Sequence, residues 1–423
     1  MNLNLGIVVL RCASSPLDIV TMTTNFIADR LSRIKPSPTM AMTRIADEKK
    51  AAGENVIGLA AGEPDFPTPS HIRQAAIAAM NAGKTKYTTV DGVPELKDAV
   101  VEKFAADNSI FCGRENITIA TGGKQILFNA LMATVNEGDE VIIPAPYWVS
   151  YPEIVRLAEG SPVILSCTED DNFKVTPDKL AAAITPKSKW LLLNSPSNPT
   201  GSVYSRDELM ALGDVVRMYP HLHVLCDDIY EYLIYDGAVF VTMAEVAPDL
   251  IPRILTLNGV SKSYSMTGWR IGYAAGPAPL IKAMAKIQSQ STSNPNSIAQ
   301  WAAVSALTGP RDFMSAQLAI FDERRRLVTD RLNEINGIRC LLPSGAFYVY
   351  PSCAGLIGRK TPDGKRLETD SDVVNYFLEA EGVATVPGIA FGLSPYFRIS
   401  YAAAADVLDD AMSRIVRAVA ALR

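Results

Sequence analysis

Histidine is scarce in this sequence, and the shortage excludes one class of active site. The chain of 423 residues has only three, His71, His221 and His223, and no His-Glu-x-x-His motif. A site with several histidine ligands is therefore excluded, and we expect no metal ion. Because histidine is the most common proton-transfer residue, such chemistry has to rest on another base here. His221 and His223 flank the start of a predicted strand, and we interpret them as structural.

Paired cysteines are also absent. The six cysteines include no Cys-x-x-Cys pair, so neither a zinc knuckle nor a redox pair is indicated. They are Cys12, Cys112, Cys167, Cys226, Cys340 and Cys353. Scattered thiols in a chain of this length are typical of a reducing compartment, where they behave as small buried hydrophobic residues.

Two further absences restrict the partners of the protein. A net charge of −5 provides no excess of basic residues for a large nucleic-acid-binding face. No apolar run is long enough to span a bilayer, and the run at 5–10 is short for a secretory signal and follows no lysine or arginine. We therefore expect a soluble, cytoplasmic protein that binds neither nucleic acid nor a membrane.

Length and pattern predict two domains, because 423 residues exceed what one hydrophobic core supports. Over 61–315, β-branched apolar runs alternate with helical patterns, which predicts an α/β domain with a mainly parallel sheet flanked by helices. Residues 316–423, together with 22–60, are expected to form a smaller α+β domain. Residues 1–21 differ from the rest and are predicted to be an N-terminal tail, disordered or a start-site artefact, with a functional arm as the alternative.

Individual elements follow from hydrophobic periodicity. In the larger domain, strands are predicted over 117–120, 140–143, 163–166, 190–193, 224–226 and 254–257, and helices over 124–135 and 207–218. In the smaller domain, a helix is expected over 321–334, strands around 347–350 and 397–400, and an amphipathic helix over 405–422. The helix at 321–334 contains Arg324, Arg325 and Arg326, which we interpret as a solvated face.

Polar residues follow several predicted strands of the larger domain. Asp227 and Asp228 come directly after one strand, Lys262 follows another, and Asn198 lies in a proline-rich loop after a third. Ligands of open α/β sheets bind at the carboxyl ends of the strands, so these side chains are candidates for a common site. Since adjacent residues point to opposite faces, only one of the two aspartates is expected to enter it.

Three more features fit such a site. Gly122 and Gly123 stand at a helix start, where free amides and the helix dipole favour an anion. Trp148 offers an aromatic face, and Arg398 is expected to face away from the apolar side of its strand. A lysine, an acid, hydrogen-bond donors, an anion cradle, an aromatic face and an arginine are the parts needed by an enzyme that uses pyridoxal phosphate on amino acids.

Other motifs fail on inspection. A P-loop would need glycine and serine or threonine at the positions of Thr118 and Gln125. The segment 259–263 lacks the final glycine of a G-x-S-x-G nucleophile elbow. No G-x-G-x-x-G follows a predicted strand, which counts against a dinucleotide-binding fold.

With these residues in view, the chain resembles the fold-type I aminotransferases that use pyridoxal phosphate, and within them the bacterial subgroup of aspartate aminotransferases. The resemblance covers nearly everything after about residue 36, with the motifs in the family's order. The motifs are Ala60-Ala61-Gly62-Glu63-Pro64-Asp65-Phe66, Thr121-Gly122-Gly123-Lys124-Gln125, Pro146-Tyr147-Trp148, Asn194 to Gly201, Asp227-x-x-Tyr230, Ser261-Lys262-x7-Arg270 and Phe397-Arg398-Ile399-Ser400.

The resemblance implies the catalytic roles. Lys262 corresponds to the lysine that forms a Schiff base with the cofactor and carries the proton. Asp227 corresponds to the partner of the pyridine nitrogen, and the spacing to Tyr230 selects it over Asp228. Tyr230 and Asn198 correspond to donors to the 3-oxygen of the ring.

The resemblance also implies the remaining binding roles. Trp148 corresponds to the residue that stacks on the ring, and the phosphate region includes Gly123, Lys124 and Arg270. Tyr87 resembles the tyrosine donated to the neighbouring subunit of a homodimer with shared active sites. For the substrate, Arg398 corresponds to the clamp on the α-carboxylate, with Gly62, Asn198 and Trp148 beside it, and Lys124 to the lysine that meets a distal carboxylate. Gly259 departs from the eukaryotic pattern, which has a phosphate-binding serine there, and Ser261 is the candidate to supply a hydroxyl instead.

The implied function is ping-pong transfer of an amino group between an L-amino acid, aspartate above all, and a 2-oxo acid such as 2-oxoglutarate or oxaloacetate. An aromatic-amino-acid or prephenate aminotransferase is the first alternative, because it would share the core residues. A pyridoxal-phosphate-dependent C–S lyase is a second. A non-catalytic regulator would need a DNA-binding module, for which the sequence offers no candidate.

Overall fold

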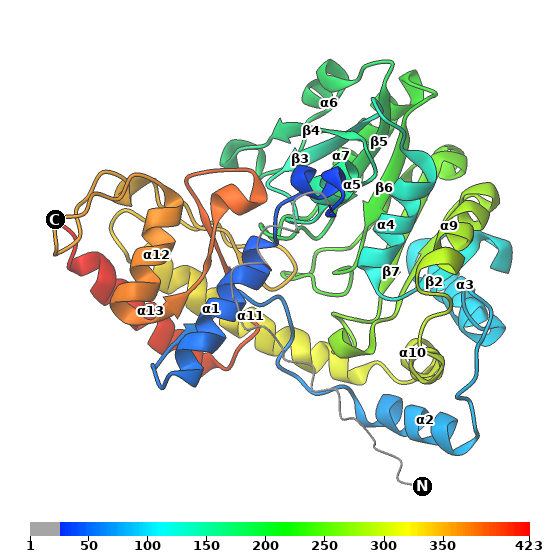
Figure 1. Cartoon of the computed structure of the whole chain (residues 1–423), viewed down its shortest axis with the longest axis horizontal. Coiled ribbons are helices and arrows are strands. Elements are labelled where there is room, and N and C mark those ends of the chain that lie inside the picture. The colour runs from blue at the N-terminus through cyan, green and yellow to red at the C-terminus, as the bar shows by residue number, and fades with distance from the viewer. Residues whose placement is uncertain (1–25) are drawn as a thin grey trace, which may run out of the picture.

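A mixed sheet of seven strands is the largest sheet in residues 26–423, which are the residues described by the computed structural model (Figure 1). Its spatial order is β2 (Ile117–Ala120), β8 (Gly272–Ala275), β7 (Ile254–Gly259), β6 (His223–Asp227), β5 (Ser188–Asn194), β3 (Glu140–Ala145) and β4 (Ser161–Ser166). The run from β7 to β4 is parallel, whereas β8 is antiparallel to both of its neighbours. The predicted mainly parallel sheet is confirmed, and the predicted tail at 1–21 lies outside the described residues.

Helices cover both faces of this sheet, so its strands are apolar on both sides. Along β5, Trp190 and Leu192 pack into one hydrophobic cluster and Leu191 and Leu193 into another. One cluster includes α4 (Gly123–Thr134), α5 (Tyr151–Leu157) and α9 (Ala278–Ser291). The other includes α2 (Ser70–Asn81), α3 (Pro94–Asn108), α6 (Pro177–Ala183), α7 (Arg206–Met218), α8 (Met243–Val246) and α10 (Ser297–Thr308).

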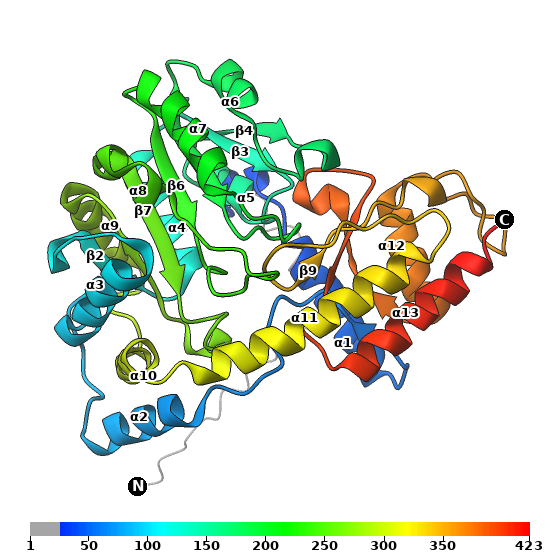
Figure 2. The ribbon, with the colours of Figure 1, turned by 180° about the vertical axis from the view of Figure 1, so that it is seen from behind.

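A second body packs beside the carboxyl ends of the strands (Figures 1 and 2). It contains two small sheets, β1 (Ile57–Gly58) with β10 (Val383–Ala384), and β11 (Val386–Pro387) with β12 (Phe397–Ser400) and β9 (Tyr348–Val349). Its helices are α1 (Pro38–Ala51), α11 (Asp312–Asn333), α12 (Asp370–Glu381) and α13 (Ala405–Ala420). One hydrophobic cluster joins residues of 42–60 to residues of 321–419. The same cluster also includes Val149, Phe173, Tyr230, Leu233 and Tyr235, so the domain division stays a prediction.

The long helix α11 connects the two bodies, running from α10 towards α12 and α13 (Figure 2). It begins at Asp312, nine residues before the predicted start at 321. The apolar pattern could not reveal this first part, because Phe321 is the first buried residue of the helix. The sequence pattern therefore detects only the part of α11 from Phe321 onward, where the helix has buried residues.

The predicted solvated face of α11 is wrong for two of its three arginines. Arg324 is 7% exposed and donates two hydrogen bonds of 2.8 Å to the carboxylate of Asp65. Arg325 has a fully buried side chain, and only Arg326 is about half exposed. A run of arginines looks solvated in sequence because two of the acids that pair with it, Asp65 and Asp236, lie elsewhere in the chain.

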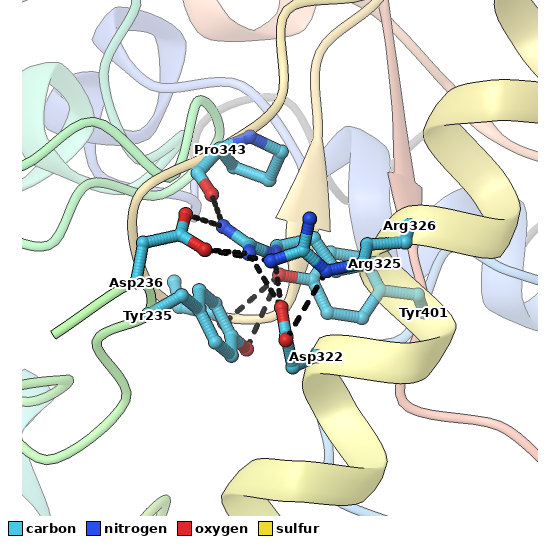
Figure 3. Close-up of polar contacts among 8 residues, drawn as sticks. Tyr235, Asp236, Asp322, Arg325, Arg326, Pro343 and Tyr401 are labelled. Atoms are coloured by element: carbon cyan, nitrogen blue, oxygen red, sulfur yellow. Dashed lines mark hydrogen bonds and ion pairs between the residues drawn. The ribbon is translucent and has the colours of Figure 1, made fainter.

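Figure 3 shows how Arg325 ties three segments together. Its guanidinium donates to Asp236 at 2.9 Å and to the carbonyl oxygen of Pro343 at 2.7 Å, and it also pairs with Asp322 one turn earlier on α11. The guanidinium carbon lies 4.3 Å from the ring centre of Tyr235. Tyr235 and Asp236 belong to the loop that follows β6, so this loop is anchored to α11.

Arg325→Ala is expected to lower the free energy of unfolding by about 2 kcal/mol, because it removes a fully buried side chain and leaves the buried carbonyl oxygen of Pro343 without its donor. Denaturant titration followed by circular dichroism measures this change. Arg326→Ala is the matched control, since Arg326 contacts the same two acids from a half-exposed position and should cost less than about 1 kcal/mol. Equal losses for the two variants would contradict the role given to burial.

Within residues 26–423, no helix combines the length and apolar character required to cross a bilayer. The cytoplasmic location stays a prediction.

Candidate active site

A cavity of about 410 Å³ lies at the carboxyl ends of the central strands. Asn194 and Asp227 are the last residues of β5 and β6, and Ser261 and Lys262 follow β7. Parallel strands end at the same edge of a sheet, so residues distant in sequence meet there. The second body closes the cavity with Arg398 from β12.

Eleven of the twelve predicted site residues line this cavity. They are Gly62, Gly123, Lys124, Trp148, Asn198, Asp227, Tyr230, Ser261, Lys262, Arg270 and Arg398. Tyr87 is the exception, because its side chain is 92% exposed and does not line the cavity. Of the two adjacent aspartates, Asp227 lines the cavity and Asp228 does not, in agreement with the predicted alternation.

Asp227 is a buried carboxylate, 6% exposed, at the floor of the site. Its Oδ2 accepts a hydrogen bond of 2.7 Å from the hydroxyl of Tyr151, and its Oδ1 accepts one of 3.4 Å from the amide of Ile229. Burial raises the pKa of Asp227 to about 6, because it penalises the charged form, while the Tyr151 hydrogen bond acts in the opposite direction. The carboxylate can therefore be ionised at neutral pH and pair with a cationic group.

Lys262 supplies an amine of unusual character. Its Nζ donates to the carbonyl oxygen of Gly62. Burial lowers the pKa of Lys262 to about 8, with a further contribution from the positive charge of Arg398. An appreciable fraction of this amine is neutral near pH 8, and a neutral amine can attack a carbonyl carbon or accept a proton.

Arg398 reaches the cavity from β12 and is only 2% exposed. It donates to Oδ1 of Asn198 at 2.8 Å and to the carbonyl oxygen of Ala60. Its guanidinium lies between the rings of Tyr348 and Phe391, with its carbon 4.6 and 5.0 Å from the ring centres. Within residues 26–423 its Nε has no hydrogen-bond partner. A guanidinium in this setting suits a carboxylate, which it can bind through two parallel hydrogen bonds.

An anion cradle is formed where α4 begins. Gly122 precedes the helix with φ +81°, and a Cβ at this position would lie 2.3 Å from Nη2 of Arg270, so glycine is needed for the close approach. The first amides of α4 have no partner within the helix, and the helix dipole adds positive potential there. The start of α4 and the guanidinium of Arg270 together suit a phosphate group.

Lys124 lies on the first turn of α4 and turns towards Trp148. Its Nζ is 4.9 Å from the centre of the Trp148 ring. Burial lowers the pKa of Lys124, and the charge of Arg270 adds to this effect. Four cationic side chains thus line the cavity, against the two acids Glu63 and Asp227. An uncharged ligand would leave this excess uncompensated, so the cavity suits a ligand with several negative charges.

Sequence reasoning missed two tyrosines of the site. Tyr348 lines the cavity, its hydroxyl lies 2.9 Å from that of Tyr230, and a Cβ on Gly62 would collide with it. In sequence it belongs to the apolar run 347–350, which looks like ordinary core. Tyr151 gave a weak signal, because it follows Trp148 by three residues, but nothing local indicates its bond to Asp227.

Comparison with known proteins gives one consistent result. The family model described as aminotransferase class I and II matches residues 54–415. A probable aspartate/prephenate aminotransferase of Rhizobium leguminosarum is 58% identical over 93% of this chain and 98% of its own length. Two solved structures are similar as well. The aspartate aminotransferase of Rhizobium meliloti has a TM-score of 0.92 at 52% identity, covering 94% of this chain and 99% of that one. The aspartate aminotransferase of Thermus thermophilus with maleate has a TM-score of 0.87 at 40% identity, covering 93% and 99%.

The lowered pKa of Lys262 predicts a pH profile for its chemical modification. Only the neutral amine reacts, and a lowered pKa moves the neutral form to lower pH, so labelling of the cofactor-free chain by formaldehyde and cyanoborohydride should rise through about pH 8. Peptide mass spectrometry measures labelling at this position, and Lys262→Ala identifies the peptide. A midpoint at the ordinary lysine value of 10.5 would contradict the effect of burial.

Proposed function

The chain belongs to the class I and II aminotransferases, and we propose that it transfers the amino group of L-aspartate to a 2-oxo acid with pyridoxal phosphate as cofactor. The observation that carries this proposal is the meeting of Lys262, Asp227 and Arg398 in one cavity. These residues provide an amine for the cofactor aldehyde, a carboxylate for its ring nitrogen and a guanidinium for the substrate carboxylate.

The residues present fit pyridoxal phosphate. The start of α4 and Arg270, with the hydroxyl of Ser261 beside them, would hold the phosphate, and Asp227 would pair with the protonated ring nitrogen. Trp148 would stack on the ring. Tyr230 and Asn198 would donate to the 3-oxygen of the ring. When bound, the cofactor supplies an electron sink that stabilises negative charge at the substrate Cα.

The chain's own groups then perform binding and proton transfer. Arg398 would bind the α-carboxylate and fix the orientation of the Cα–H bond. Lys262, released from the cofactor, would take the Cα proton and return it on the other side of the transferred nitrogen. A pKa of about 8 suits both steps, because a base works best when its pKa lies near the working pH.

Lys124 supports a substrate with a second carboxylate. Its ammonium lies in the same cavity as Arg398 and faces Trp148. Aspartate carries two carboxylates, as does the maleate named with the Thermus thermophilus structure. Prephenate also carries two, and relatives of this chain include aspartate/prephenate aminotransferases, so prephenate is the second candidate, as an amino acceptor.

The proposal includes a homodimer with shared active sites. Tyr87 is 92% exposed on its own subunit, and a large aromatic side chain in that position suits burial by a second copy. In that arrangement Tyr87 would reach the phosphate of the neighbouring site. Crosslinking or sedimentation of Tyr87→Phe and of the unmodified chain measures whether each forms a dimer. Cofactor affinity, measured for the same two proteins, reports on phosphate binding. Comparing the two measurements separates assembly from phosphate binding.

A substrate panel tests the proposed reaction. Aspartate and phenylalanine are compared as donors, with 2-oxoglutarate, oxaloacetate and prephenate as acceptors, and kcat/KM is measured for each pair. Aspartate should exceed phenylalanine as donor, and no ammonia should appear without an acceptor. Ammonia or elimination products in the absence of a 2-oxo acid would instead identify a lyase.

Lys124→Met should raise the KM for aspartate by about tenfold, because it removes a charged partner of the distal carboxylate. The KM for phenylalanine, which has no second carboxylate, should change much less. The measurement is the ratio of the KM for aspartate to the KM for phenylalanine. A general loss of cofactor or of stability affects both substrates and therefore leaves this ratio unchanged. An unchanged ratio would remove Lys124 from substrate recognition.

Lys262→Ala should abolish the absorption band of the covalent lysine–cofactor linkage and lower turnover by at least about 100-fold, because it removes both the covalent anchor and the base. Absorption spectra and steady-state rates measure the two effects. Lys286→Ala, on the exposed side of α9, is the control and should change neither. Retention of both properties by Lys262→Ala would overturn the assignment.

A further inference from the structure

Asp227 owes its setting to one buried hydroxyl from the helix α5. Tyr151, the first residue of α5, is 2% exposed, and its hydroxyl donates to Oδ2 of Asp227 at 2.7 Å. The two residues lie 76 positions apart in sequence. Their contact therefore depends on the packing of α5 against α4, β3 and β4, which brings the Tyr151 hydroxyl to the carboxyl end of β6.

We propose that Tyr151 is a positioning residue, which acts through Asp227 by orienting this carboxylate towards the ring nitrogen of the cofactor and keeping it ionised. The inference rests on the proposed function, in which Asp227 is the partner of that nitrogen.

The geometry leaves one carboxylate oxygen for the ligand. Oδ2 is taken by Tyr151, whereas Oδ1 has only the long contact of 3.4 Å with the amide of Ile229. Rotation of the carboxylate would break the bond to Tyr151, so the hydroxyl fixes the direction in which Oδ1 points.

Tyr151 is itself held in place by the residue proposed to stack on the ring. Its ring meets that of Trp148 edge to face, with centres 5.4 Å apart and planes at 80°. Both side chains belong to the segment that leads from β3 into α5. The same segment thus sets the ring-stacking face and the partner of the ring nitrogen, which couples two parts of the cofactor site.

The electrostatics agree with this geometry. Burial alone drives Asp227 towards its neutral form, and the hydrogen bond from Tyr151 is the largest influence that lowers its pKa, ahead of Ile229 and the charge of Lys262. Burial and the nearby carboxylate raise the pKa of Tyr151 well above its ordinary value, so its hydroxyl stays protonated and donates. Asp228 and Tyr230 are the other titratable groups near this pair. Without the hydroxyl, the pKa of Asp227 would be higher, so Asp227 would stay protonated up to a higher pH. In its protonated form it could not accept a proton from a pyridinium.

The competing interpretation is that Tyr151 only fills space between α5 and the sheet. Tyr151→Phe keeps the ring and removes the hydroxyl, so it separates the two. Tyr204→Phe is a matched control, because Tyr204 is a buried tyrosine, 5% exposed, whose hydroxyl accepts one hydrogen bond from the amide of Val175, and it does not line the cavity.

The first measurement uses the cofactor-free chain. Infrared difference spectra against Asp227→Asn identify the carboxylate band of Asp227, and its titration gives the pKa. Tyr151→Phe should raise this pKa above about 6, and Tyr204→Phe should leave it unchanged. An unaltered pKa in Tyr151→Phe would overturn the inference, whether or not the chain is an aminotransferase.

The second measurement compares equilibrium binding of pyridoxal phosphate with that of an analogue in which carbon replaces the ring nitrogen. Tyr151→Phe should weaken binding of pyridoxal phosphate by about tenfold, the usual effect of losing a hydrogen bond to a charged group, and leave the analogue unaffected. A space-filling role would weaken both ligands equally. In the Asp227→Asn background, Tyr151→Phe should have no further effect on either.

If the unmodified chain itself bound no pyridoxal phosphate, the proposed function would fail instead, which keeps the two failures distinct.

Discussion

Burial of charged groups is the constraint on which the active site depends. Asp227 and Arg398 are buried and Lys262 is half-buried in the cavity wall. Loss of solvent shifts the pKa of each group in the direction that favours its neutral form. These pKa shifts are useful for chemistry, because they bring Lys262 and Asp227 to pKa values of about 8 and 6, on either side of neutrality. Burial also means that each charged group needs a specific partner, since an unpaired buried charge would destabilise the fold.

The fold supplies those partners from segments that meet only after folding. The sheet brings Asp227 and Lys262 to one edge, α5 contributes the hydroxyl of Tyr151, and the second body contributes Arg398. Backbone atoms complete the arrangement, because Lys262 donates to the carbonyl oxygen of Gly62. The site is therefore a product of the junction between the two bodies rather than of either one.

The same principle governs that junction outside the cavity. Arg324 pairs with Asp65, three residues after Gly62, and Arg325 holds the loop that follows Asp227 (Figure 3). Both arginines are on α11, so one helix forms hydrogen bonds with two of the segments that carry active-site residues. A rigid connection of this kind limits how far the site residues can drift from one another.

The sequence by itself determined the order of elements and much of the site. Local periodicity predicted six of the seven strands of the sheet and missed β8. The placement of Asp227, Lys262 and Gly123 after strands or at a helix start was sufficient to predict one shared cavity. These features are local, because a strand's alternation and a helix start depend on near neighbours. The resemblance to a family then supplied roles that no local pattern contains.

Only the tertiary structure decided which polar groups are buried and with what partner. Arg325 and the half-exposed Arg326 are adjacent and chemically identical, and the difference between them comes from Tyr235 and Pro343, which the chain brings from elsewhere against Arg325. Tyr151 and Tyr348 likewise look like core residues until their hydroxyls are seen to meet Asp227 and Tyr230. The physical reason is that burial and hydrogen bonding are pairwise properties of distant segments, whereas sequence patterns report only on neighbours.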